Sequence, residues 1–175
     1  MKTIVIYNSQ TGFTKKYAEW ISEAVSCECV SFKQAAKINL ADYDAIVFGS
    51  WCMAGTVTKL NWFKKQMPAL ISAGKKLIIY AVGGSPDENP EVAVAMNRVL
   101  TEEERESVKL FYCPGGFNYE KMKAPSRFAM KMFVKGISQK KDATEAEKNM
   151  AEMISHSYDI SDKKYIEPVV AELQK

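Results

Sequence analysis

Three hydroxyl-bearing residues and one glycine are crowded into residues 8–14, directly after a short β-branched run. Ser9, Thr11 and Thr14 can each donate an O–H group, and Gly12 lets the backbone approach a ligand closely. The residues that follow have helical spacing, so this stretch lies at a helix N-terminus, where free N–H groups attract anions. An ordinary helix cap explains one hydroxyl but not three. We therefore predict a phosphate-binding loop.

The same loop lacks the lysine that a nucleotide-binding P-loop places on terminal phosphates. Neither G-x-x-x-x-G-K-[ST] nor G-x-G-x-x-G is present. Lys15 and Lys16 follow on the helix, where we expect them to face solvent. A hydroxyl-lined loop of this kind suits one terminal phosphate held by hydrogen bonds.

Two further loops with glycines follow other apolar runs, at residues 49–55 (GSWCMAG) and 83–86 (GGSP). In open α/β sheets, ligands bind at the carboxyl ends of the strands, where such loops lie. Trp51 fits a ring that stacks on a flat ligand and fits a core tryptophan equally well. Gly83 and Gly84 allow main-chain N–H groups to reach a ligand, or they form an ordinary turn.

These loops must be positioned by a regular framework. Continuous apolar runs predict five strands, and apolar residues at helical spacing predict four helices, of which Pro68 should kink or interrupt the second. The strands are expected at 3–7, 28–32, 43–49, 76–82 and 107–113, and the helices at 14–25, 58–72, 91–104 and 161–174, the last with Ser161 as N-cap. Strands that alternate with helices and are apolar throughout indicate a doubly wound α/β domain with a parallel sheet.

The net charge of +3 comes from one segment. Seven basic residues and no acidic ones lie in residues 121–141, and the rest of the chain has a net charge of −4. A helix at 126–138 would place Phe128, Met132, Phe133 and Ile137 on one face, beside a basic stripe of Arg127, Lys131 and Lys135. This pattern is typical of a helix that contacts an anionic membrane surface or an acidic partner. The other interpretation is a helix packed on the domain with a solvated basic rim.

Other classes of function are not indicated. The beginning of the chain does not resemble a signal peptide and no apolar stretch is long enough to span a bilayer, so we expect a cytoplasmic protein. The four cysteines are scattered and His156 has no neighbouring ligand types, so we expect no metal site. No nucleic-acid-binding module accompanies the basic segment.

The motif Ser9-Gln10-Thr11-Gly12-Phe13-Thr14 resembles the flavodoxin phosphate loop, [ST]-x-T-G-x-T, at the expected place after the first strand. The resemblance implies a five-stranded parallel sheet of order 2-1-3-4-5 with helices on both faces, and FMN as the cofactor. It also implies that the flavin contacts come from the three loops, namely Ser9, Gln10, Thr11, Gly12, Phe13, Thr14, Ser50, Trp51, Cys52, Met53, Ala54, Gly55, Gly83, Gly84 and Ser85.

The segment GGFNYEKMKAPSRFAMKMFVKG is similar to that of menaquinone-dependent protoporphyrinogen oxidases, which share a flavodoxin-like domain. The likeness is firm at residues 3–14, 44–50 and 112–136. We therefore expect one domain with a basic amphipathic insert at about 117–141. Residues 142–156 depart from the resemblance, because Thr144-x-x-Glu147 forms a capping box that opens an extra helix at about 144–156.

The resemblance implies an FMN-dependent oxidoreductase with a quinone or another redox partner, working at the inner face of the membrane through residues 121–141. The alternatives are a soluble electron-transfer flavodoxin and a flavin-free binding module of the same fold. No catalytic acid or base can be assigned. Asp87 and Glu88 are nearest to the three loops, and we expect them to belong to a turn and the following helix.

Overall fold

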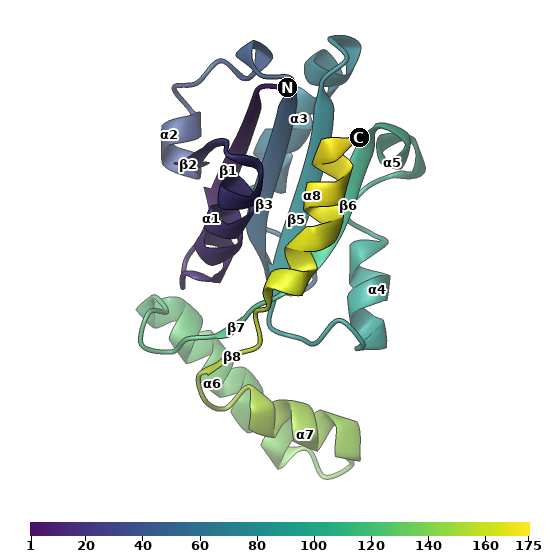
Figure 1. Cartoon of the computed structure of the whole chain (residues 1–175). Coiled ribbons are helices and arrows are strands. Elements are labelled where there is room, and N and C mark those ends of the chain that lie inside the picture. The colour runs from purple at the N-terminus through teal and green to yellow at the C-terminus, as the bar shows by residue number, and fades with distance from the viewer.

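The structure, a computed structural model, describes residues 1–175. Its centre is a parallel sheet of five strands in the order β2-β1-β3-β5-β6 (Figure 1). The short strand β4 adds an antiparallel edge beside β3. The strands are β1 (Thr3–Asn8), β2 (Glu28–Ser31), β3 (Ala45–Met53), β4 (Thr56–Val57), β5 (Lys76–Gly83) and β6 (Val108–Pro114). When the five parallel strands alone are numbered along the chain, their order is the predicted 2-1-3-4-5. The doubly wound α/β class is therefore confirmed.

Helices cover both faces of the sheet, because its strands are apolar on both sides. On one face, Ile46 and Phe48 pack against Phe63 and Met67 of helix α3. On the other face, Val47 and Ile78 belong to the cluster that helices α1 and α8 complete. The helices of this framework are α1 (Phe13–Val25), α2 (Phe32–Ala35), α3 (Leu60–Ser72), α4 (Pro90–Met96), α5 (Glu102–Ser107) and α8 (Glu167–Gln174).

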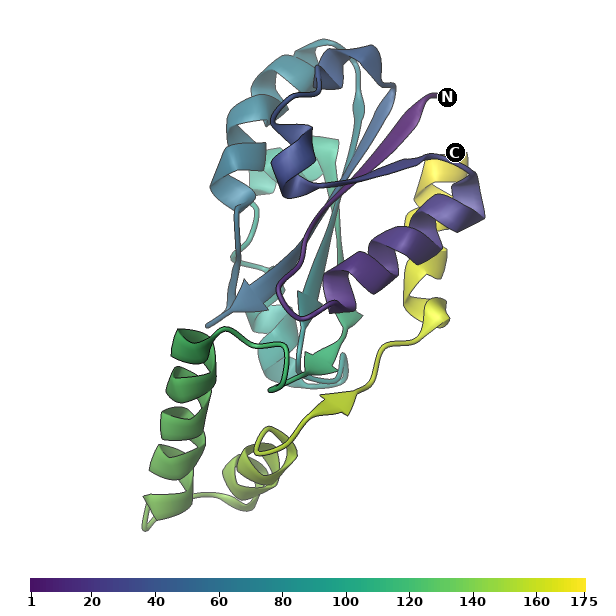
Figure 2. The same ribbon diagram turned by 90° about the vertical axis from the view of Figure 1, so that its left-hand side faces the viewer.

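An insert separates β6 from α8. It consists of β7 (Gly116–Phe117), α6 (Ala124–Gln139), α7 (Glu145–Met153) and β8 (Tyr158–Asp159). The two short strands pair antiparallel, and the two helices project beyond the carboxyl ends of the central strands (Figures 1 and 2). A capping box of Thr144 and Glu147 opens α7, as its sequence suggests.

The third strand is longer than predicted. It was expected to end at Gly49, but β3 continues to Met53 and turns back through Ala54 and Gly55 into β4. Both turn residues have positive φ, 48° and 75°, as the tight turns of hairpins require. Most of the second expected loop is therefore a rigid β-hairpin.

The helix predicted at 91–104 is instead two helices. Helix α4 ends at Met96, and the Thr101–Glu104 capping box starts α5. Val99 and Leu100 lie in the turn between them and are buried in the core. Burying these two side chains requires the chain to leave the helical path.

The predicted interruption of the second helix at Pro68 and the predicted cap at Ser161 were wrong. Helix α3 continues through Pro68, because Phe63, Met67 and Leu70 hold both of its halves on the sheet while Pro68 is exposed. The last helix starts later than Ser161. A 3₁₀ turn at Lys163–Ile166, capped by Asp162, precedes α8.

Candidate functional site

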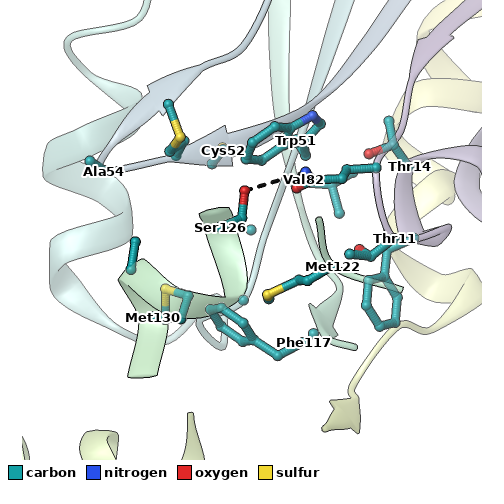
Figure 3. A pocket seen from close by; sticks show the side chains of 17 residues that line it. Thr11, Thr14, Trp51, Cys52, Ala54, Val82, Phe117, Met122, Ser126 and Met130 are labelled. Atoms are coloured by element: carbon teal, nitrogen blue, oxygen red, sulfur yellow. Dashed lines mark hydrogen bonds between the residues drawn. The ribbon is translucent and has the colours of Figure 1, made fainter. Parts of the chain in front are cut away.

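A cavity of about 220 Å³ lies where the carboxyl ends of β1, β3 and β5 meet the insert (Figure 3). Its walls come from all three expected loops and from helix α6 with the segment that leads into it. The lining residues are Gln10, Thr11, Phe13, Thr14, Trp51, Cys52, Met53, Ala54, Val82, Gly83, Gly84, Gly116, Phe117, Met122, Ser126, Ala129 and Met130.

The loop before α1 leaves several hydrogen-bond donors available to a ligand. Its own turn is closed by the Gly12 N–H, which donates to Ser9 Oγ at 3.1 Å. Gly12 caps α1 with φ 108°, a left-handed value that favours glycine, and no side chain caps the helix. The first N–H groups of α1 therefore have no partner within the helix. They lie beside Thr11 and Thr14, which face the cavity (Figure 3), and together they form a donor set suited to an anion.

Tyr80 of β5 fixes the position of this loop. Its buried hydroxyl donates a hydrogen bond to the carbonyl oxygen of Thr14 at 3.1 Å. The ring reaches this place by crossing Gly49, where any Cβ would overlap it. The glycine at the middle of β3 thus allows the sheet to hold the first turn of α1.

The neighbouring strand ends are held by a small buried polar network. Ser50 Oγ lies 2.8 Å from Thr58 Oγ1, and the side-chain amide of Asn8 donates to both hydroxyls, at 3.0 and 3.1 Å. Ser50 is fully buried. Its hydroxyl therefore braces β1 against β3 beneath the cavity.

The walls of the cavity are mostly apolar. Trp51, Cys52 and Ala54 lie on one side, and Phe117 and Met130 lie on the other (Figure 3). None of the lining residues is an acid, a histidine, a lysine or an arginine. Burial raises the pKa of the Cys52 thiol to about 12, so this group stays neutral at physiological pH. The site can hold a flat, apolar group, but it has no side chain suited to proton transfer.

Comparison with known proteins identifies the family. Residues 4–145 match the family model described as a flavodoxin domain. The chain belongs to the flavodoxin domain family. No curated protein matches it.

Several solved structures are similar to this flavodoxin domain at low sequence identity. A flavodoxin from the domain Archaea is 19% identical, with 89% of this chain and all of the other covered and a TM-score of 0.39. The Trp repressor binding protein of Bacillus subtilis is 15% identical, with 67% and 85% covered and a TM-score of 0.47. A flavoprotein of Lactobacillus acidophilus NCFM, solved in complex with FMN, is 15% identical, with 63% and 90% covered and a TM-score of 0.41.

The structure brings most of the expected site residues of the flavodoxin domain together. Ten of the fifteen line the cavity, namely Gln10, Thr11, Phe13, Thr14, Trp51, Cys52, Met53, Ala54, Gly83 and Gly84. Of the other five, Ser9 and Gly12 shape the loop and Ser50 lies in the buried network. Gly55 and Ser85 line an adjoining cleft.

Seven lining residues were not predicted from the sequence, and six of them belong to the insert. They are Val82, Gly116, Phe117, Met122, Ser126, Ala129 and Met130. Met122, Ser126, Ala129 and Met130 are spaced as residues on one face of a helix are, so the sequence indicates that their side chains point the same way. The spacing does not reveal that these side chains face the cavity.

The adjoining cleft has a volume of about 250 Å³ and shares part of its wall with the cavity. The two share six lining residues, namely Cys52, Ala54, Gly83, Gly84, Phe117 and Met130. The cleft then runs between α4 and the insert, past Met96, Phe133, Met150 and Ile154. A path lined mostly by apolar residues therefore runs along the cavity wall toward the surface.

The insert is fastened to the core at the rim of the cavity. The Tyr158 hydroxyl donates to the Gly84 carbonyl at 2.7 Å, and the Phe117 ring occupies the space that a side chain at Gly84 would fill. The Gln10 amide donates to Ser126 Oγ at 3.4 Å, which links the loop before α1 to α6 (Figure 3).

Lys16 makes a further link between the framework and the insert. We expected it to face solvent, but its ammonium group donates to Asp159 at 2.9 Å and to Ser161 at 2.7 Å. Partial burial alone would raise the pKa of Asp159. The hydrogen bonds from Ser161 and Lys16 outweigh it and hold this pKa below its usual value.

Proposed function

We propose that this flavodoxin domain binds FMN in the cavity and is an oxidoreductase. The observation that carries the proposal is the uncapped start of α1, which lies beside Thr11 and Thr14 and opens into an apolar cavity. A phosphate suits the first feature and a flat ring suits the second. The cavity and its adjoining cleft together reach the range of about 300–1,000 Å³ that is usual for small-molecule sites.

The residues present fit this cofactor. The N–H groups of α1 and the hydroxyls of Thr11 and Thr14 would hold the phosphate, and the hairpin residues Trp51 and Cys52 would face the ring. FMN supplies the acceptance and donation of electrons or hydride. The chain itself binds, orients and shields the reacting ring from water, since Phe117 and Met130 close the side opposite the hairpin. The neutral Cys52 thiol adds no charge.

The substrate that the site suits best is an apolar, planar redox partner of the quinone type. Support comes from the cleft between α4 and the insert, whose lining is mainly aliphatic, aromatic and methionine side chains. A carrier that only passes electrons through an exposed ring edge has no need of such a path. This function resembles that of the quinone-linked protoporphyrinogen oxidases.

A soluble electron-transfer flavodoxin is the second candidate. The family match favours it directly. The absence of acids, bases and histidine from the lining also fits a carrier, because electron transfer requires no side-chain proton donor.

The first experiment reconstitutes the purified protein with FMN, reduces it, and compares oxidation by a soluble naphthoquinone with oxidation by cytochrome c. We expect the quinone to be the better acceptor. The variant Ala95→Phe fills the cleft and should slow the quinone reaction at least roughly tenfold. Its reaction with cytochrome c should not change.

The matched control is Ala93→Phe, an exposed position on the same short helix. Its oxidation rates with the quinone and with cytochrome c should equal those of the wild type. Equal rates with both acceptors, unaltered by Ala95→Phe, would favour the electron carrier. A protein that takes up no added FMN would contradict both proposals and favour a flavin-free module.

A further inference from the structure

Helix α6 leaves large apolar side chains in solvent. None of its 16 residues is buried. The exposed fractions are 68% for Phe128, 51% for Met132 and 51% for Phe133. These are half of the six large hydrophobic residues that the whole chain exposes. Apolar side chains gathered on one short segment, rather than scattered singly, indicate an interaction surface.

The remaining sides of α6 are already used. Ser126, Ala129 and Met130 line the cavity. Val134 and Ile137 line the groove toward α7. Phe133 and Ile137 were predicted to share a face with Phe128 and Met132, but Phe133 lines the cleft and Ile137 lines this groove. The face of Phe128 and Met132 therefore has no partner within the chain.

This unpartnered face is positively charged along one border. Arg127, Lys131 and Lys135 follow each other at four-residue intervals, and residues 121–141 contain no acidic side chain. Two glutamates at the start of α7 are paired internally, Glu147 with Lys140 at 2.6 Å and Glu145 with Lys148 at 3.1 Å. Arg127, Lys131 and Lys135 form no salt bridge, so their charge can attract an anionic surface.

The helix is also placed where a flat surface can reach it. The insert projects from the carboxyl end of the sheet, and α6 lies at the edge of the molecule (Figure 2). Its length, one apolar face and basic border are those of helices that lie in the plane of a membrane interface. None of the helices has the length and hydrophobicity that crossing a bilayer requires.

We propose that α6 docks this protein on an anionic lipid bilayer, with Phe128 and Met132 in the interface and Lys131 and Lys135 among the lipid phosphates. Phe133, the residue after Met132, is half exposed and lines the apolar cleft, so docking would place the cleft entrance beside the bilayer surface. A quinone dissolved in the lipid would then reach the cavity without crossing water. This last step rests on the proposed function, whereas the docking itself does not.

The test is co-sedimentation of the full-length protein with vesicles of phosphatidylcholine alone or mixed with phosphatidylglycerol. We expect association with the mixed vesicles only, weakening as salt is added. The variants Phe128→Ser/Met132→Ser and Lys131→Gln/Lys135→Gln should each reduce the partition coefficient at least roughly tenfold. Both alter exposed side chains, so FMN binding should be unchanged, and a failure of docking is distinguishable from a failure of the proposed function.

The matched controls are Val94→Ser, an exposed apolar residue on α4, and Lys65→Gln, an exposed lysine on α3. Both should partition as the wild type does. Association that is absent, or that the α6 variants leave unaltered, would overturn the proposal. So would a concentration-dependent dimer that Phe128→Ser/Met132→Ser abolishes, because the face would then be covered by a second copy.

Discussion

The hydroxyl of Tyr80, in the middle of the sheet, donates a hydrogen bond at 3.1 Å to the carbonyl oxygen of Thr14, in the first turn of α1. Tyr80 is fully buried and crosses Gly49 to reach this carbonyl. The bond ties the donor-rich loop to the most buried layer of the protein. The geometry of the candidate phosphate site thus depends on a residue that does not line it.

Replacing Tyr80 by phenylalanine removes this bond and leaves the ring in place. We expect a loss of about 1 kcal/mol in the free energy of unfolding and a several-fold weaker affinity for FMN. Urea unfolding and a fluorescence titration with FMN measure the two effects. The control is Tyr43→Phe, which removes the hydrogen bond to Glu28 far from the site and should lower stability alone. Equal FMN affinity in Tyr80→Phe and wild type would show that the bond does not position the loop.

The substitution Gly49→Ala introduces a methyl group into the space of the Tyr80 ring. Such overpacking costs about 1–3 kcal/mol, which chemical denaturation will detect. In a Tyr80→Ala background the ring is gone, so the added methyl group should cost much less. A penalty of the same size in both backgrounds would mean that some other contact at Gly49 is responsible.

The substitution Gly84→Ala displaces the Phe117 ring and should loosen the insert from the core. We expect faster tryptic cleavage among the basic residues of 121–141. The control, Gly136→Ala, places a methyl group in open space within α6 and should stabilise the protein by up to about 1 kcal/mol. If Gly84→Ala leaves cleavage unchanged, the Phe117 contact does not hold the insert.

The Lys16–Asp159 pair should make this anchorage sensitive to acid. Because the folded pKa of Asp159 is lowered, its contribution to stability is present above the unfolded pKa of about 3.9 and is lost as the pH falls through the lower, folded value. The difference in melting temperature between wild type and Asp159→Asn should thus shrink below about pH 4. A difference that persists at lower pH would point to a role of Asp159 that does not depend on its charge. A ¹³C NMR titration of the carboxyl group gives the pKa directly.

The strands were predictable because each is a continuous apolar run, and runs of this kind fit a sheet covered on both faces. Their order came from the resemblance of residues 9–14 to the flavodoxin phosphate loop. The hairpin at Ala54–Gly55 was not predictable, since Trp51 and Cys52 lie between glycines and the residues around them do not alternate between apolar and polar. The break between α4 and α5 was missed for a related reason. Val99 and Leu100 continue the helical spacing, and only their burial in the core shows that the chain turns there.

For the site, the motif at residues 9–14 predicted the donor loop. The contribution of the insert was harder to foresee, because it depends on where β7 and β8 place α6. Gly84 illustrates this limit. The sequence suggested either that its backbone approaches a ligand or that it forms an ordinary turn. It did not indicate that the insert places the Phe117 ring beside Gly84 and the Tyr158 hydroxyl on its carbonyl.

The assignment of the loop before α1 as a phosphate site is tested most directly by comparing the affinities of the protein for FMN and for riboflavin, which lacks the phosphate. If the loop before α1 holds a phosphate, FMN should bind at least roughly tenfold more tightly. The variant Thr11→Val/Thr14→Val should reduce this preference while the affinity for riboflavin stays the same. Equal affinities for the two flavins in the wild type would contradict the assignment of the loop as a phosphate site.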